Sequence, residues 1–186
     1  MQNIFDNSNL IDTLKNGGVV VMPTDTIYGI LGNAFLPETV ERIYEIRQRE
    51  KEKPCIILIS DFSDLEKFNL AITDTEREFV ENEKFRALTF ILNCENQDLI
   101  YLDRGTKSLA FRIPKNENLR NLLRLTGPLI APSANIAGLK PASNIKEAKE
   151  YFGDRVDLYL DGGEIAGEPS KIIKFDKDGN ISIIRD

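Results

Sequence analysis

Histidine is absent from this chain of 186 residues. Its absence excludes Ser-His-Asp and Cys-His catalysis, together with every metal site that needs an imidazole ligand. Any chemistry must therefore rest on hydroxyl, carboxylate, amine and guanidinium groups. A reaction that needs only positioning and charge stabilisation is compatible with such a composition.

Cysteine is scarce, and the two that occur, Cys55 and Cys94, each lie beside an apolar run. We expect buried core thiols rather than a disulfide or a catalytic pair. The first residues lack the cationic flank and apolar stretch of a signal peptide, and no apolar run approaches the ~18 residues of a membrane span. These features predict a cytoplasmic protein without a membrane segment.

The chain also lacks an excess of positive charge, because 24 Lys and Arg face 30 Asp and Glu, for a net charge of −6. An acidic protein does not favour nucleic acid by bulk charge, so an anionic ligand would need a local basic cluster. Hydrophobic residues make up 41% of the sequence, enough to bury a core. Without repeats or linkers, we expect residues 1–186 to form one domain.

Glycine-rich phosphate loops are missing as well. GTKS at 105–108 lacks the spacing of a Walker A loop, and GGEIAG at 162–167 does not match the G-x-G-x-x-G of dinucleotide-binding folds. Nucleotide binding would therefore need a different cradle.

Apolar runs and turn signals predict the order of elements. Strands are expected at 19–22, 55–60, 87–92, 108–113, 129–131, 156–160, 171–175 and 181–185. Helices are expected at 8–16 with Ser8 as the cap, from 37 to the basic run near 47, after 61, and at 73–84, 117–125 and 144–152. Residues 93–106 are expected to form a loop. The alternation predicts an α/β fold with a twisted, mixed, largely parallel sheet flanked by helices.

The most informative stretch is GGVVVMPTDTIYGILGNA at 17–34. The β-branched run at 19–22 predicts a buried strand, and Pro23, which cannot donate to a ladder, marks its end. The polar residues Thr24, Asp25 and Thr26 then lie where open α/β sheets bind ligands. Their hydroxyls could bind a carboxylate or phosphate oxygen. The alternative is an ordinary turn in which Thr and Asp act as local caps.

A second strand end has the same pattern. The apolar run at 129–131 stops at Pro132, and Ser133 and Asn135 follow in PSANIAG. Two strands that end in the same kind of polar rim could face one site.

Two places offer basic side chains for an anion. The helix that begins near residue 37 ends in a run with Arg47, Arg49 and Lys53. Alone, this run fits a solvated helix end whose cations are favoured by the helix dipole. Arg112 stands in FRIP at a strand end, where it points opposite to its apolar neighbours, toward either a cavity or solvent.

Together, PTDTIYG, FRIP, PSANIAG and the arginine-rich helix end resemble the YrdC/TsaC family, the threonylcarbamoyl-adenylate synthases. The order of the motifs and the length match a single-domain member. PTDT-x-YG and PSAN-x-x-G are specific in combination and weak singly. The resemblance implies a YrdC-like sheet around a concave basic cavity.

The resemblance also implies roles for individual residues. Catalytic roles fall to Arg47 and Arg49, and Arg112 would hold the threonine carboxylate through its fork. The threonine pocket would be lined by Thr24, Thr26, Tyr28 and Arg112. Nucleotide contacts would come from Arg47, Arg49, Lys53, Ser133, Asn135, Ser170 and Arg185.

The sequence departs from the family pattern at several positions. Glu50 replaces a motif proline, Phe85-Arg86-Ala87 replaces P-G-P, Lys171 replaces a threonine and Asp186 replaces a glycine. Arg47 keeps the charge of the motif lysine but changes a point charge into a fork. A carboxylate at position 50 would repel phosphate unless it turns away or helps to hold magnesium.

The implied reaction joins L-threonine, bicarbonate and ATP into L-threonylcarbamoyl-AMP, with release of pyrophosphate. The threonine amine captures carbon dioxide as a carbamate, whose oxygen attacks the α-phosphate. Mg²⁺ would accompany ATP, and no protein metal ligands are expected. Partner proteins would then transfer the group to the adenosine beside the tRNA anticodon.

Two other hypotheses stay open. One is a divergent paralogue of the YciO type that keeps the fold with weak or altered synthase activity, as the departures would allow. The other is a YrdC-like module that binds double-stranded RNA or tRNA through a basic concave face, against which the acidic charge argues.

Overall fold

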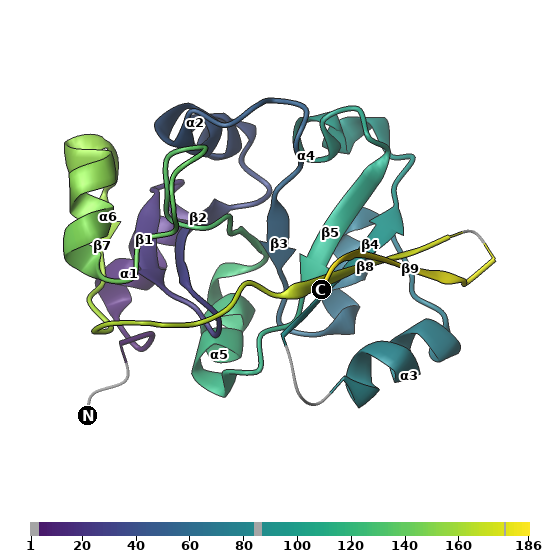
Figure 1. The fold of residues 1–186 in the computed structure, drawn as a ribbon. Helices are drawn as coiled ribbons and strands as arrows, with labels where there is room; N and C mark the ends of the chain where they lie inside the picture. The colour runs from purple at the N-terminus through teal and green to yellow at the C-terminus, as the bar shows by residue number, and fades with distance from the viewer. Residues whose placement is uncertain (1–3, 84–86, 177) are drawn as a thin grey trace.

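The computed structural model describes residues 4–83, 87–176 and 178–186, and within them nine strands form one sheet in the order β7-β1-β2-β6-β3-β5-β4-β8-β9. The strands are β1 (Val20–Pro23), β2 (Tyr28–Asn33), β3 (Ile56–Leu58), β4 (Leu88–Asn93), β5 (Ser108–Arg112), β6 (Leu129–Ile130), β7 (Leu158–Tyr159), β8 (Lys171–Phe175) and β9 (Ile181–Arg185). Figure 1 shows β7 beside α6 at one end of the molecule and the β8–β9 hairpin at the other.

The described residues also form six α-helices and three 3₁₀ helices. The α-helices are α1 (Ser8–Lys15), α2 (Pro37–Arg47), α3 (Asp74–Asn82), α4 (Ile100–Asp103), α5 (Glu117–Thr126) and α6 (Ile145–Phe152). The 3₁₀ helices are η1 (Phe62–Phe68), η2 (Gln97–Leu99) and η3 (Gly153–Arg155). Among the described residues, none of the helices is both long and apolar enough to cross a membrane.

The sheet is mixed, as the sequence predicts, but it is not largely parallel. Of the eight pairings between described strands, β1–β7, β3–β5 and β4–β8 are parallel and the other five are antiparallel. Two of the antiparallel pairs, β1–β2 and β8–β9, are joined by short hairpin turns, which cannot connect parallel strands. The turn signal DKDG at 176–179 predicts the β8–β9 hairpin, whereas the alternation of strands and helices does not reveal the β1–β2 hairpin.

Side chains of β1 and of the residue before it alternate between two hydrophobic cores. Val19 and Val21 pack in the core that contains residues of α2 and α6. Val20 and Met22 pack in the core that contains residues of α1 and α5. All four are fully buried. Successive side chains of a strand point to opposite faces, so one short run holds helices to both sides of the sheet.

Strand β2 is absent from the sequence-based expectations, because Gly29 and Gly32 weaken a strand pattern. The structure gives the reason for one of these glycines. A β-carbon on Gly32 would lie 2.4 Å from Cγ2 of Thr39, so helix α2 packs directly against the backbone of the strand. A glycine within an apolar run can therefore indicate a close approach rather than a loop.

Helix termini agree largely with the sequence. The sequence Thr73-Asp74-Thr75-Glu76 has the spacing of a capping box, which the structure shows at α3, and Asn116 caps α5. The first helix is capped by Asn7 and not by Ser8, since Oδ1 of Asn7 accepts from the Leu10 amide at 3.3 Å.

The expectation of a loop over 93–106 is wrong. Asn96 caps a helical segment there, η2 followed by α4, whose Leu99 and Leu102 are buried. Cys55 and Cys94 are buried free thiols, as expected. The departures at Phe85 and Arg86 lie outside the described residues.

Candidate active site

A cavity of about 280 Å³ lies where the PTDT and PSAN strand ends meet. The backbones of these segments are joined, because the Ile30 amide donates to the Pro132 carbonyl at 3.0 Å and the Ala134 amide to the Tyr28 carbonyl at 2.9 Å. The polar lining of the cavity consists of eight residues, all singled out from the sequence: Thr24, Thr26, Tyr28, Arg112, Ser133, Asn135, Ser170 and Arg185.

The turn after β1 holds its own shape through Thr24. The Thr24 hydroxyl donates to the Ile27 carbonyl at 2.7 Å and accepts from the Thr26 amide at 3.2 Å. Its oxygen also lies 3.1 Å from the hydroxyl of Thr26. Thr24 therefore forms the turn as a local cap, and Thr24 and Thr26 of this turn line the cavity.

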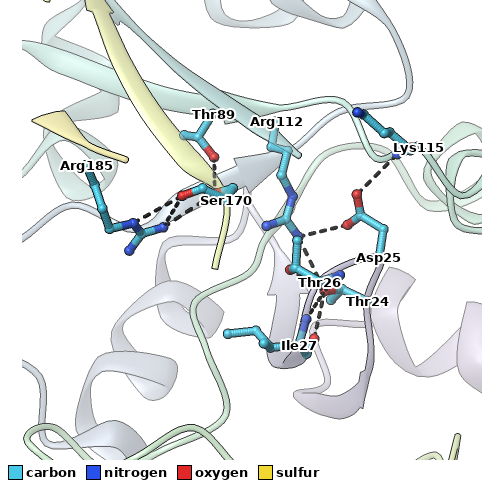
Figure 2. A network of polar contacts seen from close by, with 9 residues as sticks. All are labelled: Thr24, Asp25, Thr26, Ile27, Thr89, Arg112, Lys115, Ser170 and Arg185. Carbon is cyan, nitrogen blue, oxygen red and sulfur yellow. Dashed lines mark hydrogen bonds and ion pairs between the residues drawn. The ribbon is translucent and has the colours of Figure 1, made fainter. Parts of the chain in front are cut away.

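Arg112 enters the cavity from the end of β5 and is only 4% exposed. Its Nη2 donates to the Thr24 hydroxyl at 3.4 Å and lies 3.1 Å from Oδ1 of Asp25. Figure 2 shows the guanidinium held between these two residues. Its Nε is buried and makes no hydrogen bond within the described residues. A buried donor without a partner is costly, so this group is suited to a bound acceptor.

Three charges decide the electrostatics around Arg112. Burial lowers the pKa of its guanidinium, the carboxylate of Asp25 opposes that shift, and the nearby guanidinium of Arg185 adds to it. An anion bound between the two arginines would relieve their repulsion. The space between the two arginines could therefore hold a single carboxylate.

Arg47 lies behind the PSAN loop rather than in the lining of the cavity. It ends helix α2, is 2% exposed, and donates from Nε to the Asn135 carbonyl at 3.1 Å. Its Nη2 donates to Oδ1 of Asn135 at 3.0 Å and to the Ser133 hydroxyl at 3.3 Å. Burial lowers its pKa to about 10. The fork therefore fixes the loop that presents Ser133 and Asn135.

Arg49 and Lys53 lie past the end of α2, which stops at a left-handed Gln48. Arg49 donates to the carbonyls of Lys53 at 3.0 Å and Pro54 at 3.1 Å, and lines a second cavity of about 290 Å³. This second cavity shares Ser133 and Arg185 with the first. The side chains of the basic run therefore do not gather at one place. Arg47 is buried behind the PSAN loop, and Arg49 lines the second cavity.

The departure at Glu50 has a local partner. Its carboxylate lies 2.9 Å from the Lys53 ammonium, and both side chains are more than half exposed. An exposed pair of this kind contributes about 0–1 kcal/mol, so Glu50 mainly reduces the free charge of Lys53.

The far wall of the cavity is built by the last two strands. The Ser170 hydroxyl lies 2.7 Å from that of Thr89, and the Ser170 carbonyl accepts from Nη2 of Arg185 at 2.6 Å (Figure 2). Two departures from the family pattern, Lys171 and Asp186, form an ion pair of 3.6 Å next to this contact. The two departures therefore contact each other.

Tyr28 contributes its ring to the cavity, but its hydroxyl has other partners. The hydroxyl donates to the Gly163 carbonyl at 2.8 Å and accepts from the Gly162 amide at 2.8 Å. These glycines belong to residues 161–169, which we call the strap. The strap also crosses the turn after β1 so closely that a β-carbon on Gly167 would lie 1.7 Å from the Thr26 carbonyl oxygen. The two hydrogen bonds of the Tyr28 hydroxyl therefore hold the strap against the wall of the cavity.

Replacing Tyr28 by phenylalanine should lower the free energy of unfolding by about 2 kcal/mol, because two backbone groups lose a part-buried partner. Chemical denaturation measures this loss. Tyr159→Phe is the matched control, since its hydroxyl makes one exposed hydrogen bond to Gly153 and should cost less than half as much. Equal losses of unfolding free energy in the two variants would show that the Tyr28 hydroxyl stabilises the fold no more than an exposed tyrosine hydroxyl does.

Sequence patterns missed Asp25 as a partner of Arg112 and the strap as a wall of the site. The glycines at 162, 163 and 167 were the available signal, since closely spaced glycines accompany close backbone approach. Within the described residues, no group of three or more Cys, Asp or Glu side chains is placed to hold a metal ion.

Comparison with known families and proteins gives consistent matches. The Sua5/YciO/YrdC family model, described as "Telomere recombination", matches residues 12–186. The threonylcarbamoyl-AMP synthase of Marinobacter nauticus is 34% identical over 169 residues, which cover 87% of this chain and 86% of that protein.

Solved structures share the fold. P. abyssi Sua5 complexed with L-threonine superposes with a TM-score of 0.85 at 28% identity, covering 98% of this chain and 53% of that one, so the chain spans about half the length of that protein. E. coli YciO superposes with a TM-score of 0.82 at 24% identity, over 98% of this chain and 88% of that one, which shows a common fold.

Proposed function

Because the chain belongs to the Sua5/YciO/YrdC family, we propose that it is a threonylcarbamoyl-AMP synthase that makes L-threonylcarbamoyl-AMP and pyrophosphate from L-threonine, bicarbonate and ATP. The observation that carries the proposal is the buried Arg112, whose Nε has no hydrogen-bond partner in the described structure and which faces a cavity lined with hydroxyls. Such a group needs an acceptor, and the carboxylate of an amino acid supplies one.

The threonine half of the cavity is the turn after β1 together with Arg112. Arg112 holds the carboxylate, and the hydroxyls of Thr24 and Thr26 stand beside it for the polar groups of the amino acid. Support comes from the relative P. abyssi Sua5, which was solved with L-threonine. Tyr28 acts here through its ring and through the strap, since its hydroxyl is already used.

The nucleotide half is the PSAN loop with the surrounding cations. Ser133 and Asn135 offer polar contacts, Arg185 projects from β9, and Arg49 lines the adjoining cavity. The Lys53 carbonyl accepts from Nε of Arg49, and the Ser170 carbonyl accepts from Nη2 of Arg185. Guanidinium and ammonium groups around one space neutralise a polyphosphate. Mg²⁺ enters as part of the MgATP substrate.

The chemistry needs no covalent intermediate on the protein. Bicarbonate supplies carbon dioxide, and its remaining oxygen leaves as water after taking up the proton that the threonine amine loses when it becomes a carbamate. The carbamate oxygen then attacks the α-phosphate, and pyrophosphate leaves with the electron pair of the broken P–O bond. The protein contributes positioning of the two substrates and stabilisation of negative charge, which side chains without histidine can supply. Arg47 contributes by fixing the loop that carries Ser133 and Asn135.

The product suits transfer to tRNA by partner proteins, and a cytoplasmic location is part of the proposal because ATP and tRNA are found there. Direct binding of RNA is a second hypothesis without a specific observation in its favour, since the chain carries a net charge of −6.

The decisive experiment measures pyrophosphate release by the purified chain with ATP and Mg²⁺. We expect release that requires both L-threonine and bicarbonate, with L-serine and L-valine as controls for the amino acid. Binding of ATP and L-threonine without any release would instead favour a YciO-type paralogue. If neither ligand bound, alone or together, the synthase proposal would be wrong.

A further inference from the structure

The carboxylate of Asp25 lies directly behind Arg112, out of reach of a ligand. Its side chain is 6% exposed, and Asp25 is not among the residues that line the cavity. Oδ2 accepts from the Lys115 amide at 3.1 Å, while Oδ1 lies 3.1 Å from Nη2 of Arg112 (Figure 2). One carboxylate thereby holds both the guanidinium and the chain that follows β5. Oδ1 makes no aligned hydrogen bond in the described structure, so its contact with Arg112 is mainly electrostatic.

The cations of the site differ in their partners. Arg112 is held by a carboxylate, so the turn after β1 carries almost no net charge. Arg185 is held instead by the carbonyl and hydroxyl of Ser170, and Arg47 by Ser133 and Asn135, all neutral groups. In the half of the site with Arg112, the carboxylate of Asp25 offsets the charge of the arginine. In the half with Arg185 and the PSAN loop, the positive charge is not offset by these partners.

We propose that Asp25 is a positioning residue that sets selectivity: it fixes Arg112 and cancels its charge, so that this half of the cavity takes a zwitterionic amino acid and rejects phosphate. The inference rests on the proposed function, because it assumes that Arg112 binds the amino-acid carboxylate. It explains how a site with several cations keeps the triphosphate of ATP out of the threonine pocket.

The physical basis is the charge of the two ligands. A zwitterion presents one carboxylate and carries no net charge, so it loses little when the pocket is neutral. A dianion depends on net positive charge. Removal of one negative charge a few ångströms away should favour a dianion over a zwitterion by about tenfold or more. Asparagine has the same shape as aspartate but no charge. Its introduction at position 25 should therefore change the selectivity of the pocket while leaving the shape of the pocket nearly unchanged.

The test compares the unmodified protein with Asp25→Asn, using inorganic sulfate as the dianionic probe. L-threonine is titrated by calorimetry with and without sulfate. Sulfate should not displace L-threonine from the unmodified protein, but it should compete in the variant, with the ratio of L-threonine to sulfate affinity falling about tenfold or more. A purely structural role would weaken both ligands together. An unchanged ratio in a folded variant would overturn the proposal.

Asp157→Asn is the matched control. Asp157 also pairs with an arginine, Arg42, but on the outside of the molecule, with side chains 40% and 38% exposed. This variant loses an Asp–Arg pair far from the ligand and should leave the ratio of affinities unchanged. A similar shift in both variants would mean that overall charge, and not the charge behind Arg112, sets selectivity.

A cycle of unfolding measurements tests the pairing without any ligand. Asp25→Asn and Arg112→Gln should each destabilise the fold, and the double variant should lose less than the sum, because the lone buried charge is gone. If Asp25→Asn alone does not fold, the double variant should still fold. Additive losses of unfolding free energy, or a double variant that fails to fold, would overturn the pairing of Asp25 with Arg112. If the unmodified protein binds no L-threonine, the proposed function fails while this cycle still decides the pairing.

Discussion

An Arg112→Gln variant should bind L-threonine about thirtyfold more weakly, while its affinity for ATP stays within about twofold. One charged hydrogen-bond partner of a carboxylate contributes on the order of 2 kcal/mol, which gives the thirtyfold loss. The same change leaves the buried Asp25 without its cation, so the free energy of unfolding should fall by about 3 kcal/mol. Calorimetric titration with each substrate separates the effects, and denaturation confirms that the variant folds.

Arg124→Gln is the matched control, because it removes a half-exposed guanidinium that pairs with Glu117 on helix α5, outside both cavities. It should change neither affinity measurably. If Arg112→Gln kept its affinity for threonine and lost that for ATP, Arg112 would belong to the nucleotide and the two halves of the site would have to be exchanged.

Replacing Arg47 by alanine should reduce pyrophosphate release at least about a hundredfold. The Arg47 fork makes three hydrogen bonds to Ser133 and Asn135. Their loss leaves the Asn135 carbonyl without its donor next to an empty space, while Oδ1 of Asn135 keeps its bond from the Ser133 hydroxyl. The PSAN loop then no longer holds its side chains in place, and small displacements of positioning groups cost large factors in rate. The free energy of unfolding should also fall, by about 3 kcal/mol.

Arg42→Ala is the control on the same helix, since Arg42 forks to Asp157 on the exposed side of α2. It should keep release within about twofold. The Arg47 variant is assayed well below its own melting temperature, so that unfolded protein does not account for the loss. Retention of more than a third of the release by folded Arg47→Ala would show that the loop positions itself without this fork.

The sequence predicts the location of the site better than its internal contacts. An apolar run that stops at Pro23, and another that stops at Pro132, each place polar residues beyond a strand end, and the structure brings both into one cavity. This inference needs only local patterns. It does not need to know which strands are neighbours, because ligand sites in such sheets gather at strand ends.

Pairing across the chain is what local patterns lack. Asp25 and Arg112 meet only after the turn behind β1 has packed beside the end of β5, although the strands themselves are not neighbours in the sheet. Nothing near Asp25 in the sequence distinguishes a partner for Arg112 from a turn residue. Likewise, the tyrosine of PTDT-x-YG gives no sign that Gly162 and Gly163 will occupy its hydroxyl. Such contacts become visible only with the tertiary structure.

The wall that carries Arg185 has a consequence for synthesis of the protein. Thr24 lies near the start of the chain, whereas Arg185 belongs to β9, an edge strand whose residues are all exposed and which pairs with β8 alone. A ribosome extends the chain from its N-terminus, so the cavity stays open on one side until the last strand has emerged and docked. A nascent chain therefore has most of its core before β9 completes the cavity wall that carries Arg185.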